Sequence, residues 1–233
     1  MSSFLRILFL ILIICFEPVL KAQETVINAG YISDYDPLIY NGKQYSFFVP
    51  SNTGGDQFFE GPDYVTGSVT IRGVKYNYVR LNYDIYNQQV ILQFVNSLGA
   101  KNQIILSDAW LESFSLNEKY FELIQTQDSI RKIFQVIGDG QYRILYRWRK
   151  DLMMDGFVGA RNHTFSPAGK EMSLFSGKGI KIFTNNRSFC ALFDTVIKGK
   201  ILEYIRHNRI NVRKASDVTM DGLVNYLNSL SSQ

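Results

Sequence analysis

The segment LNYDIYNQQVILQF, from Leu81 to Phe94, decides the fold of this chain. Apolar side chains occupy every second position from Val79 to Ile85 and again from Val90 to Phe94, and the polar run Asn87-Gln88-Gln89 separates the two series. A period of two is typical of a half-buried strand, and a short polar break is typical of a turn. The segment therefore predicts a β-hairpin. In this interpretation Asp84 lies on the solvent face and is not catalytic, because no second titratable group stands near it at strand spacing.

The preceding segment, GSVTIRGVKYNYVR, predicts another hairpin from Gly67 to Arg80. Arg72 and Gly73 form its two-residue turn, because glycine accepts the positive φ angle that a tight turn requires. The apolar parity switches after Tyr78, so a β-bulge near Tyr78 and Val79, or a new strand, is needed. Consecutive hairpins of this kind predict an antiparallel sheet.

The middle of the chain continues this pattern. A hairpin is expected where RKIFQVI and YRILYRWRK flank the turn Gly138-Asp139-Gly140. The stretch from Asp151 to Gly169, which contains several glycines and Pro167, is expected to be a long loop. Other strands are expected at residues 103–106, 110–116, 120–125, 172–175 and 179–184.

The end of the chain has the period of amphipathic helices. Ile197, Ile201 and Ile205 recur at a spacing of four, and a second apolar series follows Ser216. The predicted helices run from Thr195 to Asn208 and from Asp217 to Leu230. The sequence thus predicts an α+β fold that is mainly β. Its antiparallel sheet of consecutive hairpins is expected to form a sandwich or a part-open barrel and to carry two C-terminal amphipathic helices.

The first segment is expected to be a secretory signal peptide, residues 1–22. Arg6 precedes an apolar run that is broken at Glu17 and Pro18, so no integral membrane span is expected in the mature chain. The protein is therefore expected to be exported, either to the periplasm or to the outer membrane. The remaining divisions are an irregular N-terminal arm with short strands at 23–66, a β-rich domain at 67–190 and a helix pair packed on it at 191–233.

Cysteine and histidine content limits the expected chemistry. Beyond the signal segment the sequence has only Cys190, which rules out an internal disulfide and a cysteine cluster for a metal. His163 and His207 are far apart in the sequence, and no cofactor is expected. The formal net charge of +4 is small and dispersed, which argues against nucleic-acid binding.

Three segments carry a resemblance to a known group of proteins. GSVTIRGVKYNYVRLNYDIYNQQVIL, the later strand YRWRK and the ending IKGKILEYIRHNRINVRKASDVTMDGLVNYLN together resemble exported proteins of unknown function in Bacteroidetes. The resemblance covers Gly61 to Asn228 and rests on the order and spacing of the segments. It implies a β-rich domain followed by a lysine-rich helix pair, and it assigns no catalytic residue. Gln88 and Gln89 depart from the acidic turn of that group, which argues against a cation site there.

Two short motifs are similar to the acceptor of general O-glycosylation in that phylum, an aspartate followed by serine or threonine and an aliphatic residue. The candidate sites are Ser129 and Thr195. Asp194 and Thr195 also fit the N-cap and first residue of the predicted helix. Both interpretations stay open.

The strand YRILYRWRK places Arg143, Arg147 and Arg149 on one face, where they are candidate contacts for an anionic partner. The alternative is that these arginines form a solvated face and that the aromatic residues between them belong to the core.

These features favour a non-enzymatic exported envelope protein that acts as a protein-interaction or accessory subunit, for example of an outer-membrane complex. An envelope protein is the expected partner, because the sequence shows no phosphate-binding loop, nucleophile elbow or metalloprotease motif. One alternative is a small-ligand-binding β-barrel-like protein lined by Phe and Tyr. The other is a carboxylate-based glycan hydrolase that uses Asp151, Asp155 or Glu171.

Overall fold

The computed structural model describes residues 25–29, 36–157, 160–177 and 179–231, so the predicted signal segment lies outside the described residues. The fold is mainly β, with one large antiparallel sheet of consecutive hairpins and helices at the C-terminal end. This confirms the predicted fold class. The strands of the large sheet are β1 (Thr25–Asn28), β2 (Gly42–Gln44), β4 (Val65–Ile71), β5 (Val74–Asp84), β6 (Gln89–Val95), β7 (Lys101–Leu106), β8 (Leu111–Leu116), β9 (Lys119–Gln125), β10 (Arg131–Ile137), β11 (Arg143–Arg149), β14 (Gly169–Ser176) and β15 (Gly179–Phe183).

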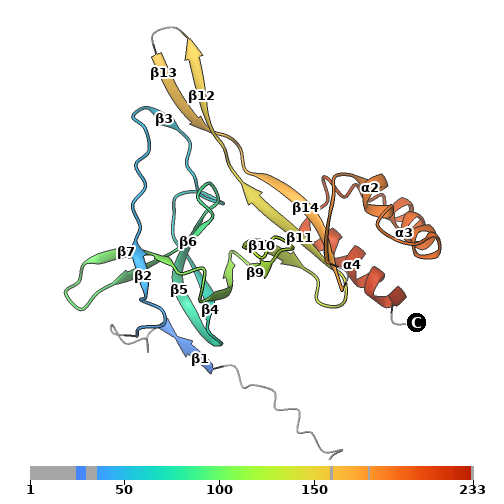
Figure 1. Ribbon diagram of the computed structural model, residues 1–233, viewed down its shortest axis with the longest axis horizontal. Helices are drawn as coiled ribbons and strands as arrows, with labels where there is room; N and C mark the ends of the chain where they lie inside the picture. The colour runs from blue at the N-terminus through green and yellow to red at the C-terminus, as the bar shows by residue number, and fades with distance from the viewer. Residues whose placement is uncertain (1–24, 30–35, 158–159, 178, 232–233) are drawn as a thin grey trace, which may run out of the picture.

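The sheet is open and is not closed into a barrel. Its strand order is β15-β14-β11-β10-β9-β8-β4-β5-β6-β7-β2, with β1 added in parallel to β5. Figure 1 shows β14 beside the helices at one end of the molecule and β1, β2 and β7 at the other. Two strands, β15 and β2, therefore form the ends of the ladder.

The segment expected to be a long loop is a hairpin instead. β12 (Leu152–Phe157) pairs with β13 (Ala160–Phe165), and β3 (Thr53–Gly54) joins β13 to make a second sheet. This hairpin projects from the rest of the molecule (Figure 1). The prediction was wrong because a strand is recognised in a sequence by alternating apolar and polar residues. Met153 and Met154 are adjacent apolar residues, and both are exposed, so this segment does not alternate.

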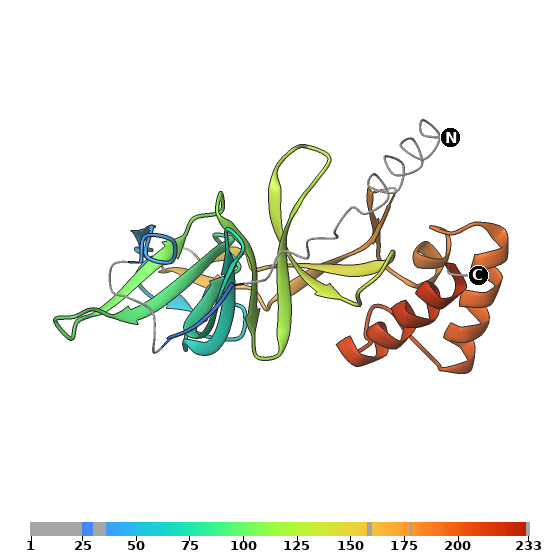
Figure 2. The ribbon, with the colours of Figure 1, turned by 90° about the horizontal axis from the view of Figure 1, so that it is seen from below.

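The helices lie together at one end of the long axis, as Figure 2 shows. The two predicted helices are confirmed as α3 (Thr195–His207) and α4 (Asp217–Ser231), and a short helix that the sequence did not predict, α2 (Asn186–Cys190), precedes them. Asp194 caps α3, because its carboxylate accepts hydrogen bonds from the amides of Val196 and Ile197, both at 3.0 Å.

Two hydrophobic clusters fill the molecule. One lies between strands of the N-terminal half and includes the stacked rings of Phe114 and Phe121, whose centroids are 4.7 Å apart. The other packs β11, β14 and β15 against the helices, and Trp148 contacts both clusters. Many of the aromatic side chains are thus part of the packed core.

Side-chain hydrogen bonds join α4 to the sheet. The indole Nε1 of Trp148 donates to Gln135 at 2.8 Å, and the amide of Gln135 donates to Asp217 at 2.6 Å. Farther along α4, Asn228 exchanges two hydrogen bonds with the backbone of Tyr142, at 2.9 and 3.0 Å. The helices therefore close the C-terminal cluster through specific polar contacts as well as apolar ones.

The bulge predicted in β5 is present at Tyr78. Val79 pairs with Gly67 and Asn77 pairs with Ser68, so Tyr78 is left without a partner and has a φ angle of 60°. The extra residue shifts the parity of the strand by one. As a result, Tyr76 before the bulge and Val79 after it both face the core.

We expect Leu81→Ala to lower the free energy of unfolding by about 2–5 kcal/mol, because Leu81 is fully buried at the centre of β5. Leu98→Ala is the matched control, since Leu98 is 90% exposed in a hairpin turn and its truncation should change stability by less than about 0.5 kcal/mol. Urea denaturation of the two variants measures the difference. Equal effects would show that β5 is not a core strand.

Candidate functional site

Asp84, expected on the surface, is completely buried. Its Oδ1 accepts hydrogen bonds from the amides of Tyr86 and Asn87 at 3.0 and 2.8 Å. Its Oδ2 accepts from the Asn87 side-chain amide at 2.8 Å and from the Tyr45 hydroxyl at 2.9 Å. The carboxylate thus organises the turn between β5 and β6.

The prediction for Asp84 was wrong because Tyr45 and residues 57–63 cover this end of β5. Phe59 donates its amide to the carbonyl of Tyr83 at 2.9 Å, and Ile85 donates to the carbonyl of Gln57 at 3.0 Å. Gln57 also donates to the Tyr45 hydroxyl at 2.9 Å. Burial, together with the neighbouring Asp84 carboxylate, raises the pKa of Tyr45, so this phenol stays protonated and donates.

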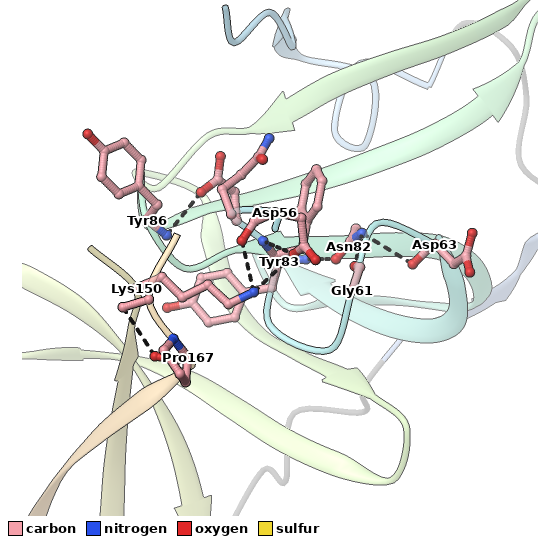
Figure 3. A network of polar contacts seen from close by, with 12 residues as sticks. Asp56, Gly61, Asp63, Asn82, Tyr83, Tyr86, Lys150 and Pro167 are labelled. Carbon is pink, nitrogen blue, oxygen red and sulfur yellow. Dashed lines mark hydrogen bonds and ion pairs between the residues drawn. The ribbon is translucent and has the colours of Figure 1, made fainter. Parts of the chain in front are cut away.

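Further polar contacts hold the same covering segment in place (Figure 3). The side-chain amide of Asn82 donates to the carbonyls of Gly61 and Asp63 at 3.1 and 3.2 Å. Lys150 forms an ion pair with Asp56 at 3.0 Å. Asn82, like Asp84, was expected to face away from the core and is buried. These groups are engaged in holding the fold together.

A different region, the end of the large sheet formed by β14 and β15, offers two spaces for a ligand. The first space, which we call the Lys170 hollow, has a volume of about 600 Å³. It is lined by Lys170, Glu171, Met172, Ile182, Phe183, Thr184, Asn185 and Arg213. The hollow therefore combines basic and apolar side chains.

The second space, which we call the Arg147 hollow, has a volume of about 310 Å³. It is lined by Thr126, Gln127, Asp128, Lys132, Phe134, Arg147, Glu171, Ser173, Ile180 and Ile182. Because Glu171 and Ile182 line both hollows, the two spaces flank the same stretch of β14 and β15.

Lys170 lies against aromatic rings of the sheet. Its Nζ is 3.8 Å from the ring centroid of Tyr146 and 5.6 Å from that of Trp148. Burial lowers the pKa of the Lys170 ammonium, while the charge of Asp217 opposes this effect. The Tyr146 hydroxyl beside it is buried and has no hydrogen-bond partner among the described residues.

The three predicted arginines have different environments. Arg143 pairs with Glu122 at 2.8 Å and lies over the ring of Phe175 at 4.5 Å. Arg149 is exposed at the end of β11. Arg147 is partly buried, and its Nε has no hydrogen-bond partner among the described residues. Of these three arginines, Arg147 is the one that lines a hollow.

The candidate glycosylation residues are both exposed. Ser129 lies in the turn between β9 and β10 with a φ angle of 61°, and Thr195 is the first residue of α3. The acidic neighbours of both are already engaged. Asp128 accepts hydrogen bonds from Lys132 and Thr126, which lower the pKa of its carboxyl, and Asp194 caps the helix.

Among the described side chains, the carboxylates considered for glycan hydrolysis do not form a catalytic pair. Asp151 is exposed and Glu171 is partly buried, while the side chain of Asp155 lies outside the described residues. Within the described part of the chain, no group of three His, Cys, Asp or Glu residues is placed to hold a metal ion. The helices described here are also too short or too polar to cross a membrane.

The sequence did not predict either hollow, although two of the lining residues, Arg147 and Glu171, were candidate functional residues. The Arg147 hollow is lined by the β9–β10 turn and by β10, β11, β14 and β15, and the Lys170 hollow by β14, β15, the two residues after β15 and Arg213. No local spacing signals such an arrangement. Comparison with protein-family models, curated proteins and solved structures finds no match for this chain.

We expect Asp84→Asn to lower the free energy of unfolding by roughly 2 kcal/mol, because an amide group cannot accept four hydrogen bonds and brings donors toward other donors. Tyr45→Phe, which removes one of the four donors, should cost about 1 kcal/mol. Denaturant titration measures both. A silent Asp84→Asn would contradict the structural role of the carboxylate.

Proposed function

We propose that this protein is a non-enzymatic exported envelope protein that acts as a protein-interaction or accessory subunit, and that it binds an extended segment of its partner along β15. The observation that carries the proposal is the free edge of β15. Among the described residues this strand is the last in the ladder and pairs with β14 alone, so no strand pairs with its other side. A free edge offers backbone donors and acceptors to an added strand.

The surroundings of β15 supply the means to select a partner. Side chains of an added strand alternate between the two faces of a sheet. The hollows lie beside this edge, and Ile182, which is 59% exposed, lines both. An apolar side chain of the partner would contact Ile182 at the position where the two hollows meet.

Charge favours an acidic partner segment. Lys181 is exposed on β15, and Lys170 and Arg213 line the larger hollow beside it. A lysine on an edge strand disfavours pairing with apolar strands, because the pairing would remove its charge from water. An acidic residue on the partner strand would form an ion pair with the lysine and offset this cost. The net charge of +4 agrees in sign with this preference.

The envelope location is supported by the sequence of residues 1–22 and by the resemblance to exported Bacteroidetes proteins. An accessory role in an outer-membrane complex fits a protein whose sheet ends in an edge strand, β15, and which carries a projecting hairpin, β12–β13 (Figure 1). The buried polar groups around Asp84 are used to hold the covering segment, which is consistent with a scaffold.

We expect a photo-crosslinking amino acid at position 182, introduced in the native host, to link the protein to one linear segment of one envelope protein. The same probe at position 218 is the matched control, because Val218 is 83% exposed on α4, away from the edge. Mass spectrometry of the crosslinked peptides identifies the segment. In a pull-down without the probe, Ile182→Lys should abolish capture of the same envelope protein, while Val218→Lys should leave it unchanged. Equal yields from both positions, or scattered targets, would contradict strand addition at β15.

A further inference from the structure

Arg147 lines the Arg147 hollow with a guanidinium group that is not fully hydrogen-bonded. Its side chain is partly buried on β11, and its Nε has no hydrogen-bond partner among the described residues. A charged group taken out of water without a partner destabilises the fold, whereas a bound anion restores the missing interaction. The arginine therefore points to a ligand that carries negative charge.

The neighbouring acids do not fill this role. Glu171 is directly opposite Arg147 in the β11–β14 ladder, but the two form no ion pair. Asp128, at the rim, is held by Lys132 Nζ at 2.8 Å and by the Thr126 hydroxyl. The Nε donor of Arg147 is thus left without a protein partner, while Asp128 is engaged by Lys132 and Thr126.

We infer that the Arg147 hollow binds the carboxylate of a small organic monoacid. The planar guanidinium presents donors in a fork that matches a carboxylate. Phe134 and Ile182 give the hollow an apolar wall for the body of the ligand, and its volume of about 310 Å³ suits a small molecule. This inference is independent of strand addition at β15.

The balance of charge favours a monoanion over a dianion such as phosphate. Two basic side chains, Lys132 and Arg147, and two acidic ones, Asp128 and Glu171, line the hollow. Lys132 pairs with Asp128, so Arg147 and Glu171 are the charges left to act on a ligand, and repulsion by Glu171 grows with each negative charge that the ligand carries. A single carboxylate needs only the donors of Arg147.

The test is saturation-transfer NMR on the full protein with hexanoate as the probe, and with hexanol and inorganic phosphate as competitors. Hexanoate should bind saturably, and neither competitor should displace it. Arg147→Gln should weaken binding by about tenfold or more, since it removes the charge-assisted pair. Arg149→Gln is the matched control, because Arg149 is exposed on the same strand, and it should leave hexanoate binding unchanged.

A second variant, Glu171→Gln, is expected to change the affinity in the opposite direction. It keeps the test decisive even where Arg147→Gln does not fold. Glu171→Gln removes the neighbouring negative charge and should tighten hexanoate binding several-fold. Near-ultraviolet circular dichroism confirms that each variant is folded. Two results would overturn the inference: no saturable hexanoate binding, or equal binding by phosphate. Neither would bear on the crosslinks from position 182.

Discussion

The buried carboxylate of Asp84 is the interaction on which the rest of the structure depends. It sits at the end of β5 and accepts hydrogen bonds from the turn that follows and from Tyr45, 39 residues earlier in the chain. The same turn contains Gln88, which donates to the carbonyls of Ile85 and Trp148 at 2.7 and 2.9 Å. One turn thus ties together the covering segment, the central hairpin and the strand that contacts both hydrophobic clusters. A buried carboxylate is tolerated here because its donors replace the water it lost.

Local periodicity was sufficient to predict the hairpins, the bulge at Tyr78 and the two long helices, because each depends on residues close in sequence. It placed Val79, Leu81, Tyr83 and Ile85 correctly on the core side. The same rule failed for Asp84, since a polar residue on the second face of a strand is assigned to solvent unless another segment is known to cover it. Residues 45–63 have no regular period, so this cover could not be predicted from their sequence.

The candidate site shows the same limit. Arg147 was identified from its strand, but Lys170 was not, because its position beside Tyr146 follows from the pairing of β11 with β14. Both hollows depend on the pairing of β14 with β15, and the Arg147 hollow also needs the β9–β10 turn, which lies far from β15 in the sequence. The molecule therefore separates its tasks. Polar groups of the central hairpin hold the fold together, while the far end of the sheet presents an edge strand, β15, that lines two spaces with basic and apolar side chains.

Native-state hydrogen exchange tests the central claim most directly, because it measures how strongly the covering segment is held to the central hairpin. The amides to follow are those of Phe59 and Ile85, which bond across this junction, and those of Tyr86 and Asn87, which bond to Asp84. If Asp84 couples these parts, the four amides exchange with the same opening free energy as the core of β5 and lose protection together in Asp84→Ala. Exchange at Phe59 and Ile85 as fast as in the exposed turn at residues 96–100 would contradict the account.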